Sequence, residues 1–494
     1  MKPTPSTPLT GFQHWAVAFV VCNFNVDVGP EIEIVYPPDV PFAHGDLSAI
    51  CFNSFPEQQN TETQDDLAFN FSITNNSPDI VLSCPRAPYA SPHTFHGSCI
   101  FRQEYDDTMK RSFNQRTLVL ITHHNFPSFY HRLLQQMVSG NHISDPTTLE
   151  AAHSQMTAWP APALGRQELP FMGSMLTLDI APHSAFPLQG LAGPIPLIHE
   201  KLNQIYAYEP LGSWDRIMHF MPCISDLYIL FEKLVLCESI IVIAESPQLA
   251  SEAVSSLVDL VRPIPYAGVV KPYATMQADF RSVGVDGGTP NPFIIGITNP
   301  FLLKRIVSAV EATQQTRPHI LYLQSFDGPV PAKRHHSLHH KSSRNVLLNL
   351  PGGGIEARMP SKRFLKSDHD VISHIETLLK SGDQTHDISP LVRRHFAELT
   401  AQFLAPINRY LAATNGPSPG GGQRYASFSS SDFMHNLGRH GTSLKVRGQS
   451  PMHKHRNRDG LYEGFCQSPN FYSWLDMKLS LEKEASAGLL GSAS

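Results

Sequence analysis

At 494 residues the chain is longer than one hydrophobic core usually organises, so we expect two or three domains. A hydrophobic content of 41% is typical of a globular protein, and a formal net charge of −5 gives no reason to expect a nucleic-acid partner. Because no run of about eighteen apolar residues occurs, any contact with a membrane should be peripheral.

The seven cysteines are scattered along the chain, without CxxC pairs or the close spacing of metal ligands. Most of them lie in apolar stretches. We therefore expect small core residues in a reduced, cytosolic protein.

The first part of the chain, 12–145, is predicted to be a small α+β domain. Two β-rich runs, 15–24 and 31–36, flank an Asp-Gly turn and predict a β-hairpin. Helices are expected over 46–52 and 128–138. Further strands are predicted at 67–73, 97–103 and 116–121.

A Pro-rich segment, 146–168, is predicted to be a joint between two domains. Trp159 and Pro160 are expected to pack across it. The pair His123-His124, next to a strand end, is expected to form a surface turn.

The central part, 169–332, is predicted to be an α/β domain with a parallel sheet. The run 239–244 is β-branched, too short for a free helix and apolar on both faces, which indicates a buried strand. Ser246 is placed to cap the following helix, and Pro247 suits its first position. A helix over 225–236 is expected to precede this unit.

The same order of strand, cap and helix recurs further along the chain. The run 292–297 is followed by Thr298, Asn299 and Pro300 and then by an apolar helical stretch. A third strand is predicted at 319–323, just before Asp327. This alternation predicts a parallel sheet with right-handed crossovers, whose loops at the carboxyl ends of the strands are the usual place for a ligand. The residues 263–291 are predicted to be a long loop.

A basic segment, 333–366, is predicted to be a solvated linker. Helical periodicity returns in 367–485, the predicted helical segment. Ser389-Pro390 repeats the pattern of a Ser cap and a Pro at the first helical position. Helices are expected over 368–379, 389–413 and 469–481, and loops over 414–431 and 445–458.

Several short strings in these elements resemble one family, the DENN domain proteins. The first hairpin, with its D-x-G turn and Y-P-P end, is similar to their upstream, longin-like part. The closest resemblance is to the class-6 DENN domain-containing proteins, which act as exchange factors for Rab GTPases. It rests on FRQEYDD, KRSFNQRTLVLIT, TAWPAP, LPFMG, GITNPFL and SPNFYSW, which occur in the family's order.

This resemblance implies a tripartite module: a longin-like domain, a central parallel sheet and a downstream helical segment. It also implies a cytoplasmic exchange factor that is recruited to endosomal or recycling membranes and clamps the switch regions of a Rab-family GTPase. The nucleotide and Mg²⁺ would belong to that partner. The candidate residues facing the GTPase are Asp27, Glu31, Ser246, Pro247, Thr298, Asn299 and Asp327.

The sequence is compatible with other functions. A chain with this fold could bind a GTP-loaded Rab as a non-exchanging effector, adaptor or tether. Relatives of the folliculin type use an arginine in a similar loop to accelerate GTP hydrolysis, so Arg111 is a candidate arginine finger. For Ser246-Pro247 and Asn299-Pro300 at the strand ends, the simpler interpretation is that they cap helices and do not contact a GTPase.

The sequence offers no pattern for bond-making chemistry. Gly352-Gly353-Gly354 lacks the Lys-Ser/Thr of a phosphate loop, and neither GxSxG nor HExxH occurs. The histidines of the basic segment have no surrounding structure to hold a metal. We therefore expect no catalytic residue, metal or cofactor in this chain. These histidines are His335, His336, His339 and His340.

The basic stretches 333–344 and 445–458 admit two interpretations. The simpler one is solvated loops. The other is attraction to an anionic lipid surface, which gains roughly 1 kcal/mol per cation near the surface.

Overall fold

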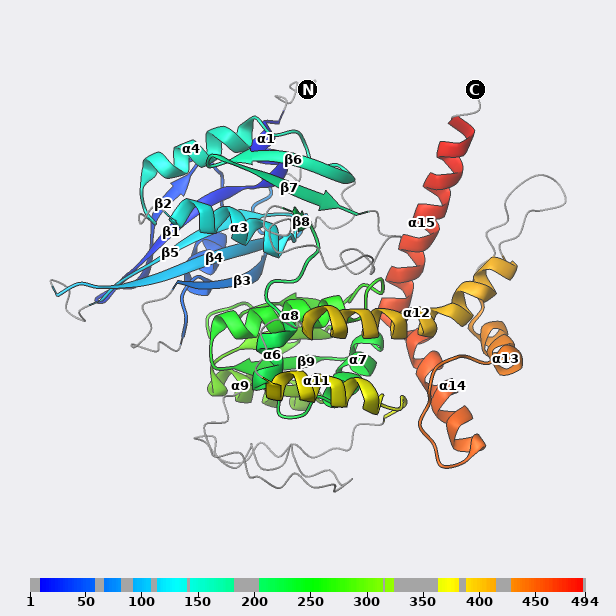
Figure 1. Cartoon of the computed structure of the whole chain (residues 1–494). Coiled ribbons are helices and arrows are strands. Elements are labelled where there is room, and N and C mark those ends of the chain that lie inside the picture. The colour runs from blue at the N-terminus through cyan, green and yellow to red at the C-terminus, as the bar shows by residue number, and fades with distance from the viewer. Residues whose placement is uncertain are drawn as a thin grey trace.

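A five-stranded antiparallel sheet organises the upstream part of the chain (Figure 1). We describe a computed structural model, which covers residues 9–57, 66–80, 92–107, 113–139, 143–181, 204–313, 316–323, 363–381, 388–414 and 428–491. The strand order is β2-β1-β5-β4-β3. The strands are β1 (Ala18–Asn25), β2 (Gly29–Tyr36), β3 (Leu67–Thr74), β4 (Thr94–Tyr105) and β5 (Phe113–Thr122). The predicted hairpin is confirmed as β1–β2.

The two faces of this sheet are covered differently. Phe19 and Val21 of β1 face α3 (Pro127–Val138), together with α1 (Gly11–Trp15) and α4 (Pro146–Thr157). Val20 and Cys22 point to the other face, which meets α2 (His44–Asn53) and the central part of the chain. Both faces are therefore buried, as the period-two alternation of these apolar residues requires.

The expected joint, 146–168, is more ordered than predicted. Asp145 caps α4 by accepting a hydrogen bond from the Thr147 amide, and Pro146 takes the first helical position. Trp159 is buried, and its Nε1 donates to the Pro170 carbonyl at 2.9 Å. The three-stranded sheet that follows packs on the upstream core. Its strands are β6 (Gly165–Phe171), β7 (Ser174–Ile180) and β8 (Gln204–Tyr206).

The pair His123-His124 is not a surface turn, which corrects the prediction. Both rings are buried, and the His124 ring stacks on Phe126 with 5.2 Å between centroids. Burial lowers the pKa of His124 to about 4, so this imidazole is neutral at physiological pH. The aromatic residues that follow in the sequence supply the contacts that bury it.

A four-stranded parallel sheet forms the central part, in the order β10-β11-β9-β12. Its strands are β10 (Val269–Lys271), β11 (Phe293–Ile297), β9 (Ile240–Ala244) and β12 (His319–Leu323). Ile240 and Val242 face α8 (Pro247–Leu260), whereas Ile241 and Ile243 face α9 (Pro300–Ala312). Because helices cover both faces, β9 is apolar on both sides, and the predicted fold class is confirmed.

The expected loop 263–291 contains a strand that the sequence did not predict. β10 has only three residues, and it ends at Lys271, just before Pro272. A short helical turn, η2 (Val285–Gly287), lies in the same stretch. Two valines and a lysine between turn-forming residues carry no recognisable period, so only the neighbouring strand β11 defines β10.

The downstream segment consists of helices that pack against the central part (Figure 1). Two predicted boundaries are corrected. The expected basic loop 445–458 ends in the first turns of α14, and Ser389 lies inside α12 instead of capping it. The helices are α11 (His369–Ser381), α12 (Ile388–Thr414), α13 (Ser430–His440), α14 (Pro451–Gln467) and α15 (Pro469–Gly491).

Polar side chains of the central part hold the downstream segment. Asp215 of α6 (Trp214–Phe220) accepts hydrogen bonds from the Ile388 and Ser389 amides, and so caps α12 from another helix. Glu232 of α7 (Asp226–Val235) accepts bonds from the Phe364 and Leu365 amides. Burial raises the pKa of Glu232 to about 7.

Asn470 gives a physical reason for one of the family strings, SPNFYSW. Its side chain is fully buried, donates to the Leu234 carbonyl at 2.6 Å and accepts from the Ala267 amide at 2.7 Å. One amide group therefore joins α15, the end of α7 and the loop before β10. Glutamine has the same amide group but a longer side chain.

Among the described residues, five cysteines are buried and Cys223 is partly exposed, and all six carry free thiols. None of the described helices is apolar over a sufficient length to cross a membrane. The boundaries of the predicted domains, 12–145, 146–168, 169–332, 333–366 and 367–485, stay a prediction.

Candidate functional site

The parallel sheet brings two of the predicted helix starts together at its carboxyl edge. Ser246 follows β9 and Thr298 follows β11, and these strands are direct neighbours, with Ile297 paired to Ile243. The Ser246 hydroxyl accepts a hydrogen bond from the Leu249 amide, and the Asn299 side chain accepts one from the Phe301 amide at 2.9 Å. Both residues therefore act as helix caps.

Not all of the predicted residues can touch a partner. Thr298 is only 3% exposed, and Pro247 is buried as well. Ser246 and Asn299 are partly exposed. Of these four predicted residues, only the two capping side chains are thus available at this edge, and each of them is already engaged with its own helix.

Phe301, which the sequence analysis did not single out, is the most exposed aromatic residue at this edge. It occupies the second position of α9, and 70% of its surface is exposed. The cap at Asn299 and the proline at position 300 fix the first turn of the helix, and so hold Phe301 in solvent. An exposed aromatic side chain held in a fixed position can serve as an anchor for a protein partner.

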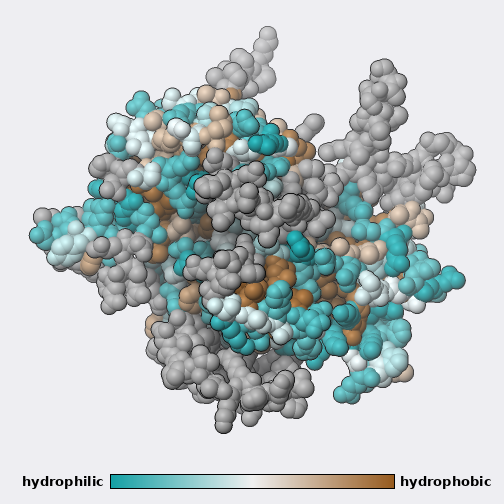
Figure 2. Space-filling model, viewed as in Figure 1, coloured by the Kyte–Doolittle hydropathy of each residue, from teal (hydrophilic) through white to brown (hydrophobic). Residues whose placement is uncertain are grey.

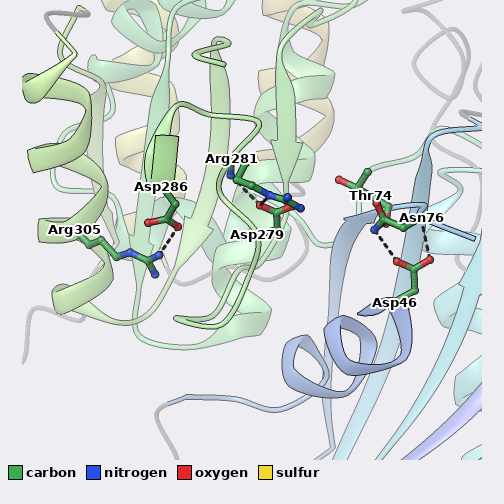
Figure 3. Close-up of polar contacts among 7 residues, drawn as sticks. All are labelled: Asp46, Thr74, Asn76, Asp279, Arg281, Asp286 and Arg305. Carbon is green, nitrogen blue, oxygen red and sulfur yellow. Dashed lines mark hydrogen bonds and ion pairs between the residues drawn. The ribbon is translucent and has the colours of Figure 1, made fainter. Parts of the chain in front are cut away.

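Two ion pairs of charged side chains lie on α9 and in the loop after β10 (Figure 3). Arg305, one turn along α9, pairs with Asp286 and donates to the Met276 carbonyl at 3.0 Å. Arg281 forms a bidentate pair with Asp279, which lowers the pKa of that carboxyl. Since both arginines are paired, this rim is close to neutral in charge and geometrically fixed.

The same loop is bonded to the upstream part of the chain. The Met276 amide donates to the Glu57 carboxylate at 2.6 Å, and the Glu57 amide donates to the Tyr273 hydroxyl at 3.0 Å. The Ser72 hydroxyl of β3 donates to the Val270 carbonyl at 2.6 Å. These bonds fix the upstream sheet against the carboxyl edge of the central sheet.

Across from Arg281, the end of β3 contributes exposed polar groups (Figure 3). Thr74 and Asn76 are exposed there. The buried Asp46 holds this turn, because its carboxylate accepts bonds from the Asn76 amide and from the Asn76 and Ser77 side chains. The candidate site is thus a surface built by α9, the loop 272–292 and the end of β3.

Two strand glycines are packed so closely that a side chain would not fit. In β4 of the upstream sheet, a Cβ on Gly97 would lie 2.3 Å from the Phe71 ring. In β11, a Cβ on Gly296 would meet the Pro272 carbonyl oxygen at 2.1 Å. Gly296 therefore lets the loop after β10 approach the strand that leads to Phe301.

Asp27 and Glu31 lie on a different element, the turn between β1 and β2. Asp27 is exposed, and the Asn25 side chain accepts a bond from its amide and donates to Glu31 at 3.4 Å. The hairpins β1–β2 and β4–β5 reach outward on the same side of the molecule (Figure 1). Arg111 and Asp327 lie outside the described residues, as do the four histidines of the basic segment.

Among the described residues, no three His, Cys, Asp or Glu side chains are arranged to hold a metal ion. The polar groups of the candidate site are caps, ion pairs and links between segments. This arrangement supports the binding of another surface.

Comparison with known proteins gives relatives over most of the chain, although no family model matches it. The chain is 27% identical to Protein DENND6A of Gallus gallus over 493 residues, which cover 95% of this chain and 80% of that protein. It is 28% identical to Protein DENND6B of Homo sapiens, covering 97% and 82%. A Protein DENND6 homolog of Dictyostelium discoideum is 24% identical over 467 residues.

Proposed function

Because the chain is a homologue of the class-6 DENN domain-containing proteins, we propose that it is a guanine nucleotide exchange factor for a Rab-family GTPase. The observation that carries this proposal is the surface around Phe301. It joins an exposed aromatic anchor to a rim of polar groups from two parts of the chain. A GTPase bound there would be held against both parts.

Exchange of this kind is a matter of linked binding and needs no nucleophile. A nucleotide bound at nanomolar to picomolar strength is held by roughly 12 to 16 kcal/mol, so it leaves slowly without help. A protein that binds the nucleotide-free GTPase more tightly than the loaded form must weaken nucleotide binding by the same factor. The nucleotide and Mg²⁺ are the partner's.

Rigidity favours such a mechanism, since a preformed surface can favour one conformation of its partner. One apolar cluster runs from the upstream sheet through α8 to α12 and α14. Glu57, Ser72 and Tyr273 add polar links between the upstream and central parts. The protein is therefore expected to change shape little on binding.

Nucleotide release across a panel of Rab GTPases tests the proposal. We expect accelerated GDP release from one Rab or a few related ones, and tighter binding to the nucleotide-free form than to the GTP-loaded form. Preference for the loaded form would instead identify an effector, adaptor or tether. Accelerated GTP hydrolysis that Arg111→Ala abolishes without weakening binding would identify a GTPase-activating protein.

We place the site of action at the cytoplasmic face of endosomal or recycling membranes, where the chain would be peripherally recruited. The family resemblance supports this location. Imaging of the tagged full chain together with its responsive Rab tests it, and a uniformly soluble distribution that does not change with the Rab would contradict it.

A further inference from the structure

The junction of α13 and α14 carries a local excess of positive charge. Residues 439–458 contain six Lys or Arg residues and no Asp or Glu, although the whole chain has a formal net charge of −5. The six are Arg439, Lys445, Arg447, Lys454, Arg456 and Arg458. The net charge of this segment is thus positive, opposite in sign to that of the whole chain.

Most of these cations are exposed, and they are close together on one projecting end. We call Arg447, Met452, Lys454 and Arg456 the basic tip. All four are exposed, as are His453 and His455 between them. In Figure 1 the first turns of α14 lie at the lower right edge of the molecule, and Figure 2 shows mostly hydrophilic residues in that region.

Arg447 acts electrostatically on the buried Glu232 and favours its charged form, whereas Lys454 and Arg456 are not used to hold the fold together. Among the ion pairs of the described residues, Lys445 meets Asp368 at 3.4 Å and Arg458 meets its neighbour Asp459, whereas none joins Lys454 or Arg456. The first turn of α14 contains no acidic residue. Unpaired positive charge that does not stabilise its own helix is expected where it meets a partner.

Met452 adds an apolar contact to this charge. Its side chain is 73% exposed, more than any other large apolar side chain among the described residues. A convex end that combines cations with an exposed apolar side chain fits a flat, negatively charged and apolar layer. We propose that the basic tip is a membrane contact that binds anionic lipid head groups.

The alternative occupant, an acidic protein segment, fits the geometry less well. Such a segment usually binds in a groove, whereas the tip projects from the body of the molecule. A lipid surface requires only that the cations reach it together. The tip lies on α14 and not on the Phe301 surface, so this inference does not depend on the proposed exchange activity.

Co-sedimentation of the full chain with vesicles tests the inference. Vesicles of phosphatidylcholine with about a third phosphatidylserine are compared with pure phosphatidylcholine, at about 0.1 M and about 1 M salt. We expect binding only to the anionic vesicles, and its loss at high salt. The triple variant Arg447→Glu/Lys454→Glu/Arg456→Glu is expected to bind about tenfold more weakly or worse.

The control variant carries the same total change in charge, at three exposed cations outside the basic tip. Arg166, Lys304 and Lys380 are exposed on other elements, so Arg166→Glu/Lys304→Glu/Lys380→Glu should bind vesicles much as the wild type does. Met452→Ser should weaken binding at unchanged charge. Thermal unfolding of each variant verifies that the fold is intact.

Equal binding of the wild type and the tip variant to anionic vesicles would overturn the inference. So would equal loss in the tip and control variants, because net charge alone would then explain the binding. Binding to polyglutamate without binding to anionic vesicles would assign the tip to an acidic protein segment instead. Exchange in solution is expected to be unaffected by the tip variant, which separates this test from that of the proposed function.

Discussion

Helices α8 and α9 follow neighbouring strands of one sheet, yet α8 is buried along most of its length whereas α9 exposes Phe301 in its first turn. Each has a capping side chain, Ser246 or Asn299, and a proline at the first position. α8 lies between the central sheet and the upstream sheet. α9 covers the other face, where Phe301 reaches solvent.

The same local sequence pattern, a capping side chain followed by a proline, thus serves two roles. In α8 the pattern places a helix in the core that joins the parts of the chain. In α9 it places a surface for a partner. The cap and the proline determine where a helix begins, and the surroundings determine what it does.

The largest expected effect comes from opening a cavity in α8. Leu257 is 1% exposed and belongs to the core shared by upstream, central and downstream parts. Leu257→Ala should lower the free energy of unfolding by about 2–5 kcal/mol. Denaturant unfolding measures this, and a loss below about 0.5 kcal/mol would mean that α8 is not a central core element.

Removing the capping side chain should lower the free energy of unfolding by a similar amount in the two helices. Ser246→Ala and Asn299→Ala each remove one side-chain bond to a helix amide, so each should destabilise by about 1 kcal/mol. Exchange measured on the same two variants should fall more for Asn299→Ala, because that cap orients Phe301. Equal loss of exchange in both variants would remove the functional distinction between the helices.

A buried carboxylate, Glu252, gives α8 a pH dependence. Burial raises the pKa of Glu252, and the nearby Arg216 and Gln248 offset this in part. The folded state then binds the proton more tightly than the unfolded state, so this carboxylate is expected to reduce stability as pH rises above about 4.5.

Glu252→Gln should remove that dependence, which amounts to at most about 1.4 kcal/mol per pH unit. Gln keeps the size of the side chain and can still contact Gln248, which donates to Glu252 at 3.0 Å. Thermal unfolding of the wild type and of Glu252→Gln between pH 4.5 and 7 measures how the pH dependence of stability differs between them. Parallel stability profiles would show that Glu252 does not titrate differently on folding.

The sequence predicted those elements whose signals are local. β9 was found from five consecutive apolar residues, and α8 and α9 from their Ser and Asn caps followed by Pro. α12 was found from its periodicity, but its start was misplaced. The group that caps it is Asp215, which lies far from it in the sequence.

The sequence predicted the sheet edge on which we propose the site, but it did not predict Phe301. Strand ends identify the carboxyl edge of a parallel sheet, so Ser246 and Asn299 were correctly brought together. The exposure of Phe301 depends on which face of α9 packs on the sheet, and an isolated Phe next to Leu302 and Leu303 gives no sign of it. The burial of His123 and His124 was missed for the same reason.

GDP release from the responsive Rab, measured with Phe301→Ala, tests the central claim most directly. The stability of this variant should change by less than about 0.5 kcal/mol, since the side chain is exposed. Tyr472, which is 62% exposed on α15, provides the matched control Tyr472→Ala. We predict release about tenfold slower with Phe301→Ala and unchanged with Tyr472→Ala. Wild-type release with Phe301→Ala would contradict the assignment of the carboxyl edge as the surface that binds the GTPase.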